Sequence, residues 1–153
     1  MKPLTTFASK FGAHIALNPE FIVEKGQRYY LLNPKTRRVT RPEFYYAGLY
    51  LGKVKNGKFF PSFNFLNMLS EVAANKIFLE NKAAWLFICG RDLFRKGITR
   101  TQGSQHKGDF TLIMNMHSEC LGFGMIIENF DSSGNSVVVK NVLDVGDFLR
   151  REQ

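Results

Sequence analysis

The 153-residue sequence predicts an α+β protein, in which a small α/β N-terminal domain precedes a small β barrel. Three observations lead to this class. Helical and strand patterns are mixed over the first half, where Asn56-Gly57 marks a tight hairpin. From Lys76 onward, short apolar segments alternate with glycine-rich or polar turns, and a small barrel closes such strands most simply. Apolar residues make up 44% of the chain and include fifteen phenylalanines, enough to bury a core.

The first element is an amphipathic helix within residues 1–17, because Phe7, Phe11 and Ile15 recur every four residues. The segments that follow are short, and proline and asparagine punctuate them. Up to the hairpin we expect strands at 21–24 and 29–33, a turn at 33–38, a short strand at 39–40, and a short helix at 41–48 that opens with Pro42.

The hairpin is the most specific local signal, because both residues of an Asn-Gly loop adopt positive φ readily. A two-residue loop places Lys55 opposite Lys58 and Lys53 opposite Phe60. Strand alternation then puts these four side chains on one face and leaves Val54 and Phe59 on the other. Like charges directly opposite each other are unfavourable, so an anion on that face would relieve them. Alternatively, the lysines protect an exposed sheet edge from aggregation.

After the hairpin, we expect residues 64–74 to form a helix with an apolar face. From Lys76 onward, the sequence changes to short strand-like segments. We place the domain boundary near Asn81, giving an N-terminal domain over 1–81 and a C-terminal domain over 82–153. The expected strands of this second region are "KIFLE" at 76–80, "AAWLFIC" at 83–89, "FTLIMNM" at 110–116, "LGFGMII" at 121–127 and "SVVVKNV" at 136–142.

The net charge of +8 favours a nucleic-acid or acidic-membrane partner. Residues 25–58 contain nine Lys or Arg and only Glu43 as an acid, so this segment carries the whole excess. No apolar run approaches the ~18 residues of a membrane helix. The two cysteines, Cys89 and Cys120, are interpreted as reduced, buried thiols of a cytosolic protein.

The stretch "LFICGRDLFRKGITR" sends positive charge out beside an apolar segment, between Gly90 and Gly97. We expect about two helical turns there, with Arg91 and Arg95 on one face and Gly97 as a left-handed cap. Arg95 and Lys96 would then complement the helix dipole, which is a purely structural role. Arg100 and Lys107 extend the basic character, so phosphate binding is slightly favoured.

The C-terminal segment "DVGDFLRREQ" predicts a short final helix with Arg150 and Arg151 side by side. Phosphate contact is one role for such a pair. An ion pair with Asp147, three and four residues earlier, is the structural alternative, and exposed pairs of this kind contribute little, roughly 0.3–0.5 kcal/mol.

The sequence offers no catalytic constellation. It lacks a phosphate-binding glycine loop and a dinucleotide fingerprint, and "GFG" at 122–124 is too short to count. His117 and Cys120 have H-x-x-C spacing, but structural zinc needs four ligands and nothing orders Cys89 and His106 beside them. Neither cysteine is expected to be an exposed, electropositive nucleophile. We therefore expect no enzyme activity, no cofactor and no metal.

From Trp85 onward, "LFICGRDLFRKGITR", "KGDFTLIMNM", "LGFGMII" and "VVVKNVLDVGDFLRRE" resemble a PUA domain. "LGFG" followed by "DVGDFLRRE" is most similar to the Nip-seven family of ribosome-biogenesis factors. "MKPLT", "GKF" at 57–59 and the helix at 64–74 resemble the N-terminal half, or pre-PUA domain, of that family. The resemblance is strong from residue 85 and loose before it, and its specificity rests on the order of short motifs.

This resemblance implies a PUA-type pseudobarrel behind an α/β domain, and a non-catalytic role in large-subunit rRNA processing. It also implies binding of uridine-rich single strands through basic residues at the C-terminal edge, which correspond here to Arg150 and Arg151. Archaeal relatives carry further basic residues where this sequence stops, so residues 91–107 or the basic hairpin are expected to compensate. Tyr45, Tyr46 or Phe60 could stack on unpaired bases.

We expect pre-rRNA as partner, with ribosome-assembly or exosome-associated proteins as further partners, no membrane contact and a monomeric state. An archaeal-type chain would be cytoplasmic, and a eukaryotic one nucleolar. Two alternatives stay open at this point. The chain could be a protein-interaction adaptor in an RNA-processing complex, or an accessory subunit of an RNA-modifying enzyme.

Overall fold

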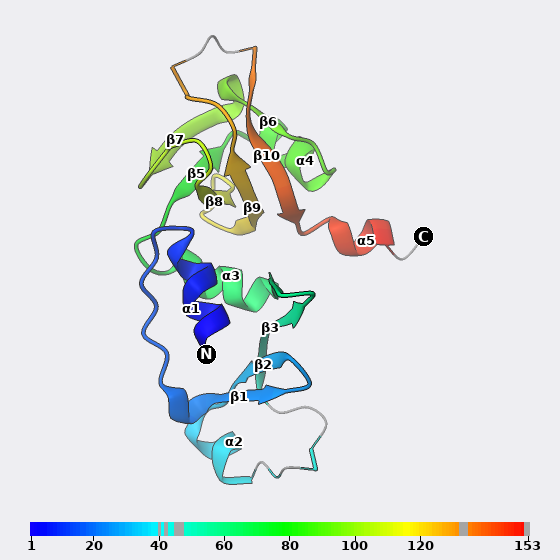
Figure 1. Ribbon diagram of the computed structural model, residues 1–153. Helices are drawn as coiled ribbons and strands as arrows, with labels where there is room; N and C mark the ends of the chain where they lie inside the picture. The colour runs from blue at the N-terminus through cyan, green and yellow to red at the C-terminus, as the bar shows by residue number, and fades with distance from the viewer. Residues whose placement is uncertain (40, 42, 45–47, 132–134, 152–153) are drawn as a thin grey trace.

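The computed structural model describes residues 1–39, 41, 43–44, 48–131 and 135–151, without the side chain of Phe148. Two sheets with two helices between them form the molecule, and a short helix projects from the C-terminal end (Figure 1). This arrangement confirms the predicted α+β class.

The four-stranded sheet is antiparallel throughout, in the order β1-β2-β3-β4. Its strands are β1 (Ile22–Lys25), β2 (Arg28–Leu31), β3 (Leu49–Lys55) and β4 (Lys58–Pro61). Lys55 lies opposite Lys58 and Lys53 opposite Phe60, which confirms the predicted hairpin and its register. Asn56 and Gly57 both adopt positive φ, as this two-residue loop requires.

Two longer helices and short helical segments complete this half. The helix α1 (Lys2–Ser9) is shorter than the sequence predicts, because the chain turns at Gly12, where φ is positive. The helix α3 (Phe63–Ser70) begins at Ser62, whose hydroxyl accepts the Phe65 N–H at 3.2 Å. The segment η1 (Pro19–Phe21) is a single 3₁₀ turn before β1.

The segment before the hairpin departs from expectation. The predicted turn at 33–38 is the helix α2 (Pro34–Val39), because the Asn33 side chain accepts the Thr36 N–H at 2.8 Å and so caps its start. Val39 is helical, so the predicted strand at 39–40 is wrong there, and Thr40 lies outside the described residues. Much of the helix predicted at 41–48 also lies outside them, while Phe44 N–H closes a turn onto Arg41.

The six-stranded sheet has the order β6-β10-β9-β8-β5-β7 and is curled into a half-barrel (Figure 1). All neighbours are antiparallel except β5 and β8, which run parallel. Its strands are β5 (Lys76–Leu79), β6 (Leu93–Phe94), β7 (Ile98–Gln102), β8 (Phe110–Met114), β9 (Cys120–Ile126) and β10 (Val137–Asp144). The boundary after residue 81 stays a prediction; the sheet itself begins at Lys76.

Two predictions around Gly90 are wrong in opposite directions. The expected strand at 83–89 is the helix α4 (Asn81–Ile88), whose buried residues Ala83, Ala84 and Phe87 follow helical rather than alternating spacing. The expected helix at 91–96 is instead β6 followed by the 3₁₀ turn η2 (Arg95–Gly97). A seven-residue apolar run fits either structure, and tertiary packing decided. The final helix α5 (Asp147–Arg151) is confirmed.

A phenylalanine cluster joins the two sheets. The ring of Phe7 on α1 lies 5.2 Å from Phe59 of β4 and 5.6 Å from Phe123 of β9. Helix α3 likewise contacts both β3 and β9. Aromatic pairs at such distances prefer tilted or edge-to-face packing, which these pairs adopt. The two halves therefore share one core, and a second core lies between α4 and the half-barrel.

Candidate nucleic-acid interface

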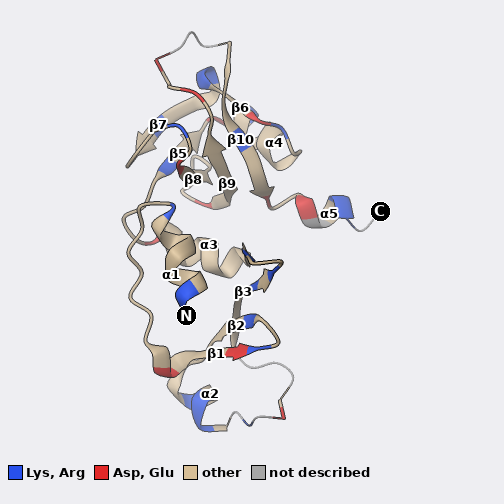
Figure 2. Cartoon of the chain, in the orientation of Figure 1, with Lys and Arg blue, Asp and Glu red and all other residues tan. Residues whose placement is uncertain are grey.

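The predicted RNA-binding residues lie in three places, among the Lys and Arg that Figure 2 colours blue along the whole chain. Each place is defined by the elements that carry its basic residues. The C-terminal cluster contains Arg91, Arg150 and Arg151; the β6–β7 segment with its following loop contains Arg95, Lys96, Arg100 and Lys107; and the hairpin contains Lys53, Lys55 and Lys58.

The C-terminal cluster is built where α4 ends. Gly90 follows the helix with φ of 90°, and a Cβ there would lie 3.3 Å from the guanidinium carbon of Arg150. The approach of α5 to α4 also needs Gly146, because a Cβ at that position would lie 2.0 Å from the Ile88 carbonyl oxygen. Glycine at position 146 therefore lets the last segment of the chain dock on the end of α4, and Gly90 supplies the positive φ of the turn after that helix.

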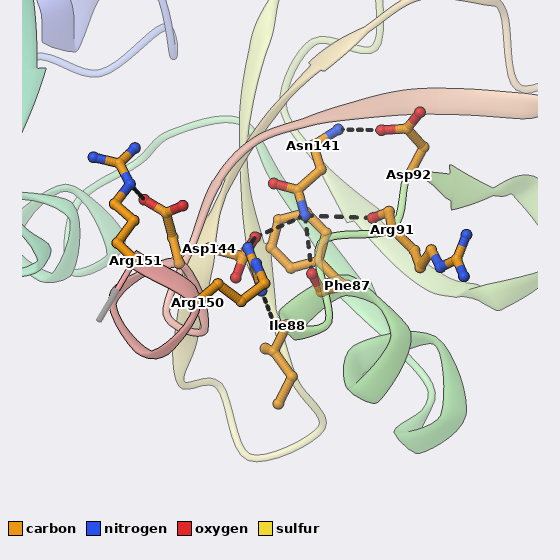
Figure 3. Close-up of polar contacts among 9 residues, drawn as sticks. Phe87, Ile88, Arg91, Asp92, Asn141, Asp144, Arg150 and Arg151 are labelled. Carbon is orange, nitrogen blue, oxygen red and sulfur yellow. Dashed lines mark hydrogen bonds and ion pairs between the residues drawn. The ribbon is translucent and has the colours of Figure 1, made fainter. Parts of the chain in front are cut away.

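Asn141 of β10 fixes the loop after α4 (Figure 3). Its side-chain amide donates to the carbonyls of Phe87 at 2.9 Å and Arg91 at 3.4 Å, and to Asp144 at 3.1 Å. Its backbone N–H donates to the Asp92 carboxylate at 2.8 Å. One residue of the strand thus satisfies groups before and after Gly90, so the loop is held in one conformation.

Arg150 is engaged by the fold. Its guanidinium donates to the Asp144 carboxylate and to the Ile88 carbonyl oxygen, each at 2.7 Å (Figure 3). The hydrogen bond with Asp144 raises the pKa of Arg150 above its ordinary value. A cation beside the last carbonyls of a helix also complements its dipole. The predicted contact of Arg150 with RNA stays a prediction, but its side chain already has structural partners.

Asp144 and Asn141 are the residues that sequence reasoning missed. Asp144 is 2% exposed, and its Oδ2 receives both Asn141 and Arg150. Its other oxygen, Oδ1, has no hydrogen-bond partner among the described residues. The only local signal is an acidic residue at the end of an apolar strand, because the partners lie on α4 and α5 and no local pattern reveals them.

Arg151 and Arg91 differ from Arg150. The Arg151 side chain is 77% exposed, and its Nε pairs with Asp147 at 2.8 Å, one helical turn back. This is the ion pair that the sequence offered as the structural alternative, and such an exposed pair contributes little. Arg91 is exposed beside Gly90 on the fixed loop. Its backbone is held by Asn141, and the close-up shows its side chain extending away from Asp144 (Figure 3).

Around β6 and β7, two arginines have intramolecular partners. Arg95 donates from Nε to the Phe130 carbonyl at 3.1 Å and lies over the Phe130 ring. The guanidinium carbon of Arg100 lies 3.9 Å from the centre of the Phe78 ring, a cation–π contact. Lys96 and Lys107 are exposed. Because the predicted helix at 91–96 is absent, the dipole role suggested for Arg95 and Lys96 does not apply.

On the hairpin, Lys53, Lys55 and Lys58 are all exposed, as alternation predicts. Phe60 shares their face and is 47% exposed, whereas Phe59 packs inward against Phe7. Tyr45 and Tyr46, the other aromatic residues considered for stacking, lie outside the described residues.

The thiols are arranged differently from the prediction. Cys89 is exposed at the end of α4, so the expectation that both thiols are buried is wrong for it. Cys120 is partly buried, and burial raises its pKa to about 11. It is therefore protonated near neutral pH and a poor nucleophile. Across the described ranges, no group of three or more His, Cys, Asp or Glu is placed to hold a metal ion.

Ser104, His106 and Asp109 meet in the loop before β8, but not in a catalytic order. The Ser104 hydroxyl donates directly to the Asp109 carboxylate and lies 2.8 Å from His106 Nδ1. A nucleophilic triad places the imidazole between the other two and uses both ring nitrogens. Here the same nitrogen, Nδ1, faces both partners, so no proton relay is built.

The two helices that meet at the C-terminal cluster carry exposed apolar side chains. Trp85 and Leu86 on α4 are 64% and 42% exposed, and Leu149 on α5 is 73% exposed. In the part of the chain that the structure describes, no helix is both long enough and apolar enough to span a bilayer.

A family model described as UPF0113 PUA domain matches residues 75–153, just over half of the chain. The matched region begins immediately before β5 and includes α4, the whole six-stranded sheet and α5. No curated protein sequence matched the chain.

Solved structures resemble the fold over nearly its full length. A hypothetical protein from the hyperthermophilic archaeon Pyrococcus horikoshii OT3 gives a TM-score of 0.64 at 15% identity, covering 99% of this chain and 92% of that one. A conserved PUA domain protein from Thermoplasma acidophilum gives 0.62 at 17% identity, with the same coverage. At these identities the likeness shows the fold, and it confirms the predicted PUA pseudobarrel behind an N-terminal domain.

Other matched chains are longer than this one. A PUA domain structure from Aeropyrum pernix K1 gives a TM-score of 0.52 at 17% identity, covering 61% of this chain and 56% of that chain. The chain spans only 24% of a chain from an archaeal box H/ACA ribonucleoprotein complex, at a TM-score of 0.43 and 20% identity over 46% of this chain.

Proposed function

Because the chain belongs to the UPF0113 PUA domain family, we propose that it is a non-catalytic RNA-binding protein that acts in ribosome biogenesis. A PUA domain is an RNA-binding fold, and the C-terminal half of this chain has that fold. The sequence resemblance to the Nip-seven family supports the finer part of the proposal. That part is binding of uridine-rich single strands of pre-rRNA during large-subunit maturation.

The observation that carries the RNA-binding proposal is the fixed loop after α4. Gly90 and Asn141 fix this loop, which carries the exposed Arg91, and the exposed Arg151 follows Arg150 on the helix that docks there. Guanidinium groups bind phosphate oxygens in a bidentate geometry, and a rigid loop loses little entropy when the strand arrives. Among the described residues, the ion pair recorded for Arg151 is the weak one with Asp147.

The arrangement of the described titratable side chains supports a non-catalytic role. PUA modules are often attached to RNA-modifying enzymes, so the chain could also serve one as an accessory subunit. The described thiols, imidazoles and carboxylates form no relay that would activate a nucleophile. Incubation of the purified chain with uridine-rich RNA, followed by nucleoside mass spectrometry, should show no modified base; a modified base would overturn this part.

The test of RNA binding is a salt titration with a labelled oligouridylate. We expect Arg91→Ala with Arg151→Ala to weaken binding and to reduce the slope of log K against log salt by about 1.4, because two phosphate contacts are lost. The matched control is Lys82→Ala with Lys140→Ala, which removes the same charge from exposed positions on α4 and β10. Equal loss in both double variants would mean that net charge, and not the loop, binds the strand.

The biogenesis part needs a test in cells of the source organism. On depletion of the chain we expect precursors of the large-subunit rRNA to accumulate, while small-subunit rRNA matures normally. The chain should also sediment with large-subunit precursors, in the cytoplasm of an archaeon or in the nucleolus of a eukaryote, as a monomer before it binds. Normal large-subunit rRNA after depletion would contradict this role.

A second candidate function is a protein-interaction adaptor, and the exposed Trp85 and Leu149 favour it. Exposed apolar patches mark interaction surfaces, and these two side chains lie on helices that meet where Arg150 contacts Ile88. Ribosome-assembly or exosome-associated proteins are the partners we would expect. Trp85 is the only tryptophan, so its fluorescence reports on α4 alone. Quenching on addition of oligouridylate would place RNA on α4, whereas bound RNA with unchanged emission would leave that face available to a protein.

A further inference from the structure

The outer face of the four-stranded sheet carries a second group of basic residues, which we call the basic face. It consists of Arg28, Lys53, Lys55, Lys58 and Phe60, all exposed. None of these residues belongs to the half-barrel that matches the PUA domain family. The face therefore needs an explanation of its own.

Strand register places these residues beside one another. Arg28 of β2 lies opposite Lys53 of β3, and Lys53 lies opposite Phe60 of β4, so the three form one row across the sheet. Lys55 and Lys58 form the next row toward the hairpin loop. Side chains two apart on a strand share a face, so both rows point to the same side.

The other side of the same strands is buried. Tyr29 and Phe59 alternate with the basic residues and pack ring to ring at 6.2 Å. Phe59 also meets Phe65 of α3 at 5.7 Å. Because these aromatic residues are held in the shared core, the register of the strands is fixed. The basic side chains therefore stay next to one another on the exposed face.

The charges of the basic face are not neutralised within the described part of the chain. None of Arg28, Lys53, Lys55 and Lys58 forms an ion pair with an acidic residue there. Like charges directly opposite each other destabilise a strand pair, and the face contains two such pairs, Arg28 with Lys53 and Lys55 with Lys58. The fold thus tolerates repulsion that a bound polyanion would relieve.

Protection of a sheet edge does not account for this face. Lysine on an exposed edge strand blocks unwanted pairing, and β4 is an edge strand, so that role suits Lys58. Arg28 and Lys53, however, lie on β2 and β3, the two interior strands. Their backbones are already paired on both sides, so they have no edge to protect.

We propose that the basic face is a second binding site for single-stranded RNA, separate from the C-terminal cluster. Arg28 and the three lysines contact phosphates, and the Phe60 ring stacks on an unpaired base. A sheet with an aromatic side chain among cations is a common platform for single strands, because every base has a flat face to stack. A paired duplex would hide its bases from Phe60, so we assign the site to single strands.

The experiment measures binding of fluorescein-labelled oligouridylate of about 12 nucleotides to the full chain at several salt concentrations. The variant Lys53→Ala, Lys55→Ala, Lys58→Ala should bind at least tenfold more weakly at low salt. Its slope of log K against log salt should fall by about 2, because three phosphate contacts are lost. A variant with unchanged affinity and slope would overturn the proposal and leave an acidic protein as the partner of this face.

The matched control removes the same three charges from α2, through Lys35→Ala, Arg37→Ala, Arg38→Ala. These residues are exposed and belong to the same basic segment. We expect this control to lose less than threefold in affinity. Equal losses in the two triple variants would overturn the site, since diffuse positive charge would then explain both.

Phe60 separates base stacking from apolar contact. Phe60→Leu keeps an apolar side chain of similar size but removes the flat ring, and we expect both it and Phe60→Ala to bind at least fivefold more weakly. Full affinity in Phe60→Leu would overturn the stacking role. Circular dichroism and thermal melting should show that each variant is folded, because Phe60 is half exposed and none of the lysines is buried.

The two proposals fail separately. The triple lysine variant is also measured in the Arg91→Ala, Arg151→Ala background. If the C-terminal cluster has no role, that background binds normally and the lysine effect remains. If the basic face has no role, the lysine variant binds normally and only the Arg91 and Arg151 effects remain.

Discussion

The C-terminal cluster and the basic face carry the same kind of residue, but the fold holds them in different ways. Arg150 donates to a buried carboxylate and to a helix carbonyl, so its charge is used inside the molecule. Lys53 and Lys55 project from interior or hairpin positions, with a like charge opposite each of them. The comparison teaches that availability for a ligand depends on the partners of a cation more than on its place in a basic segment.

The largest expected effect on stability comes from the buried carboxylate at the C-terminal cluster, Asp144. Asp144→Ala should lower the free energy of unfolding by about 2 kcal/mol, because it leaves the guanidinium of Arg150 and the amide of Asn141 without their common acceptor. Urea denaturation measures this change. The matched surface variant Lys58→Ala should stay within about 0.5 kcal/mol. A small effect of Asp144→Ala would remove the distinction between the two regions.

The two thiols allow RNA binding at the C-terminal cluster to be tested separately, because only Cys89 is exposed there. Cys89 is exposed at the C-terminal cluster, whereas burial raises the pKa of Cys120 to about 11. At neutral pH we expect iodoacetamide to alkylate Cys89 at least tenfold faster, because the thiolate is the reactive form. RNA bound at the C-terminal cluster should protect Cys89, and mass spectrometry of the alkylated peptides follows both sites. Equal protection in the Arg91→Ala, Arg151→Ala variant would contradict RNA binding at this cluster.

Cys120 also predicts how stability depends on pH. Its thiol has an unperturbed pKa of 9.0 and a folded pKa of about 11, so the unfolded chain releases this proton first as pH rises. Its contribution to the free energy of unfolding is complete below pH 9 and is lost as pH rises toward 11. Cys120→Ser should flatten this decline in a series of thermal melts. A decline of the same steepness in both proteins would assign it to other groups.

Arg150→Lys tests the role of Arg150 directly. Lysine keeps the charge but cannot donate to Asp144 and Ile88 in the fixed fork geometry of a guanidinium. We expect this substitution to lower the free energy of unfolding by an amount close to that of Arg150→Ala. An unchanged slope of RNA affinity against salt in both variants would limit Arg150 to this structural role. A reduced slope in Arg150→Ala that Arg150→Lys restores would show that Arg150 contacts phosphate.

The smallest effect lies on the basic face. Lys55→Ala removes one member of a like-charged pair, so it should leave the protein as stable as before or more stable by about 0.3 kcal/mol at low salt. The gain should disappear at high salt, where the repulsion is screened. Thermal melts at two salt concentrations measure it. Destabilisation by Lys55→Ala would mean that the lysine has a structural partner in solution.

Local signals predicted the hairpin and the final helix, because an Asn-Gly loop and an apolar-acidic-basic pattern act over a few residues. In the segment 83–97, the predicted strand is a helix and the predicted helix is a strand with a 3₁₀ turn. An apolar run of seven residues suits a strand or a helix, and only packing against the half-barrel selects α4. The candidate site shows the same difference between local and long-range contacts. Lys53, Lys55 and Lys58 were placed correctly on one face, whereas the partners of Arg150 come from segments about 60 residues earlier and from a buried carboxylate. No local pattern reveals such contacts.

The phenylalanine cluster around Phe7 has a consequence for any long RNA. Because one core joins both sheets, we expect the half-barrel and the four-stranded sheet to keep a fixed distance from each other. A transcript that touches both surfaces must therefore span one set gap. The protein would then select RNA by the length of its single-stranded segment as well as by its bases.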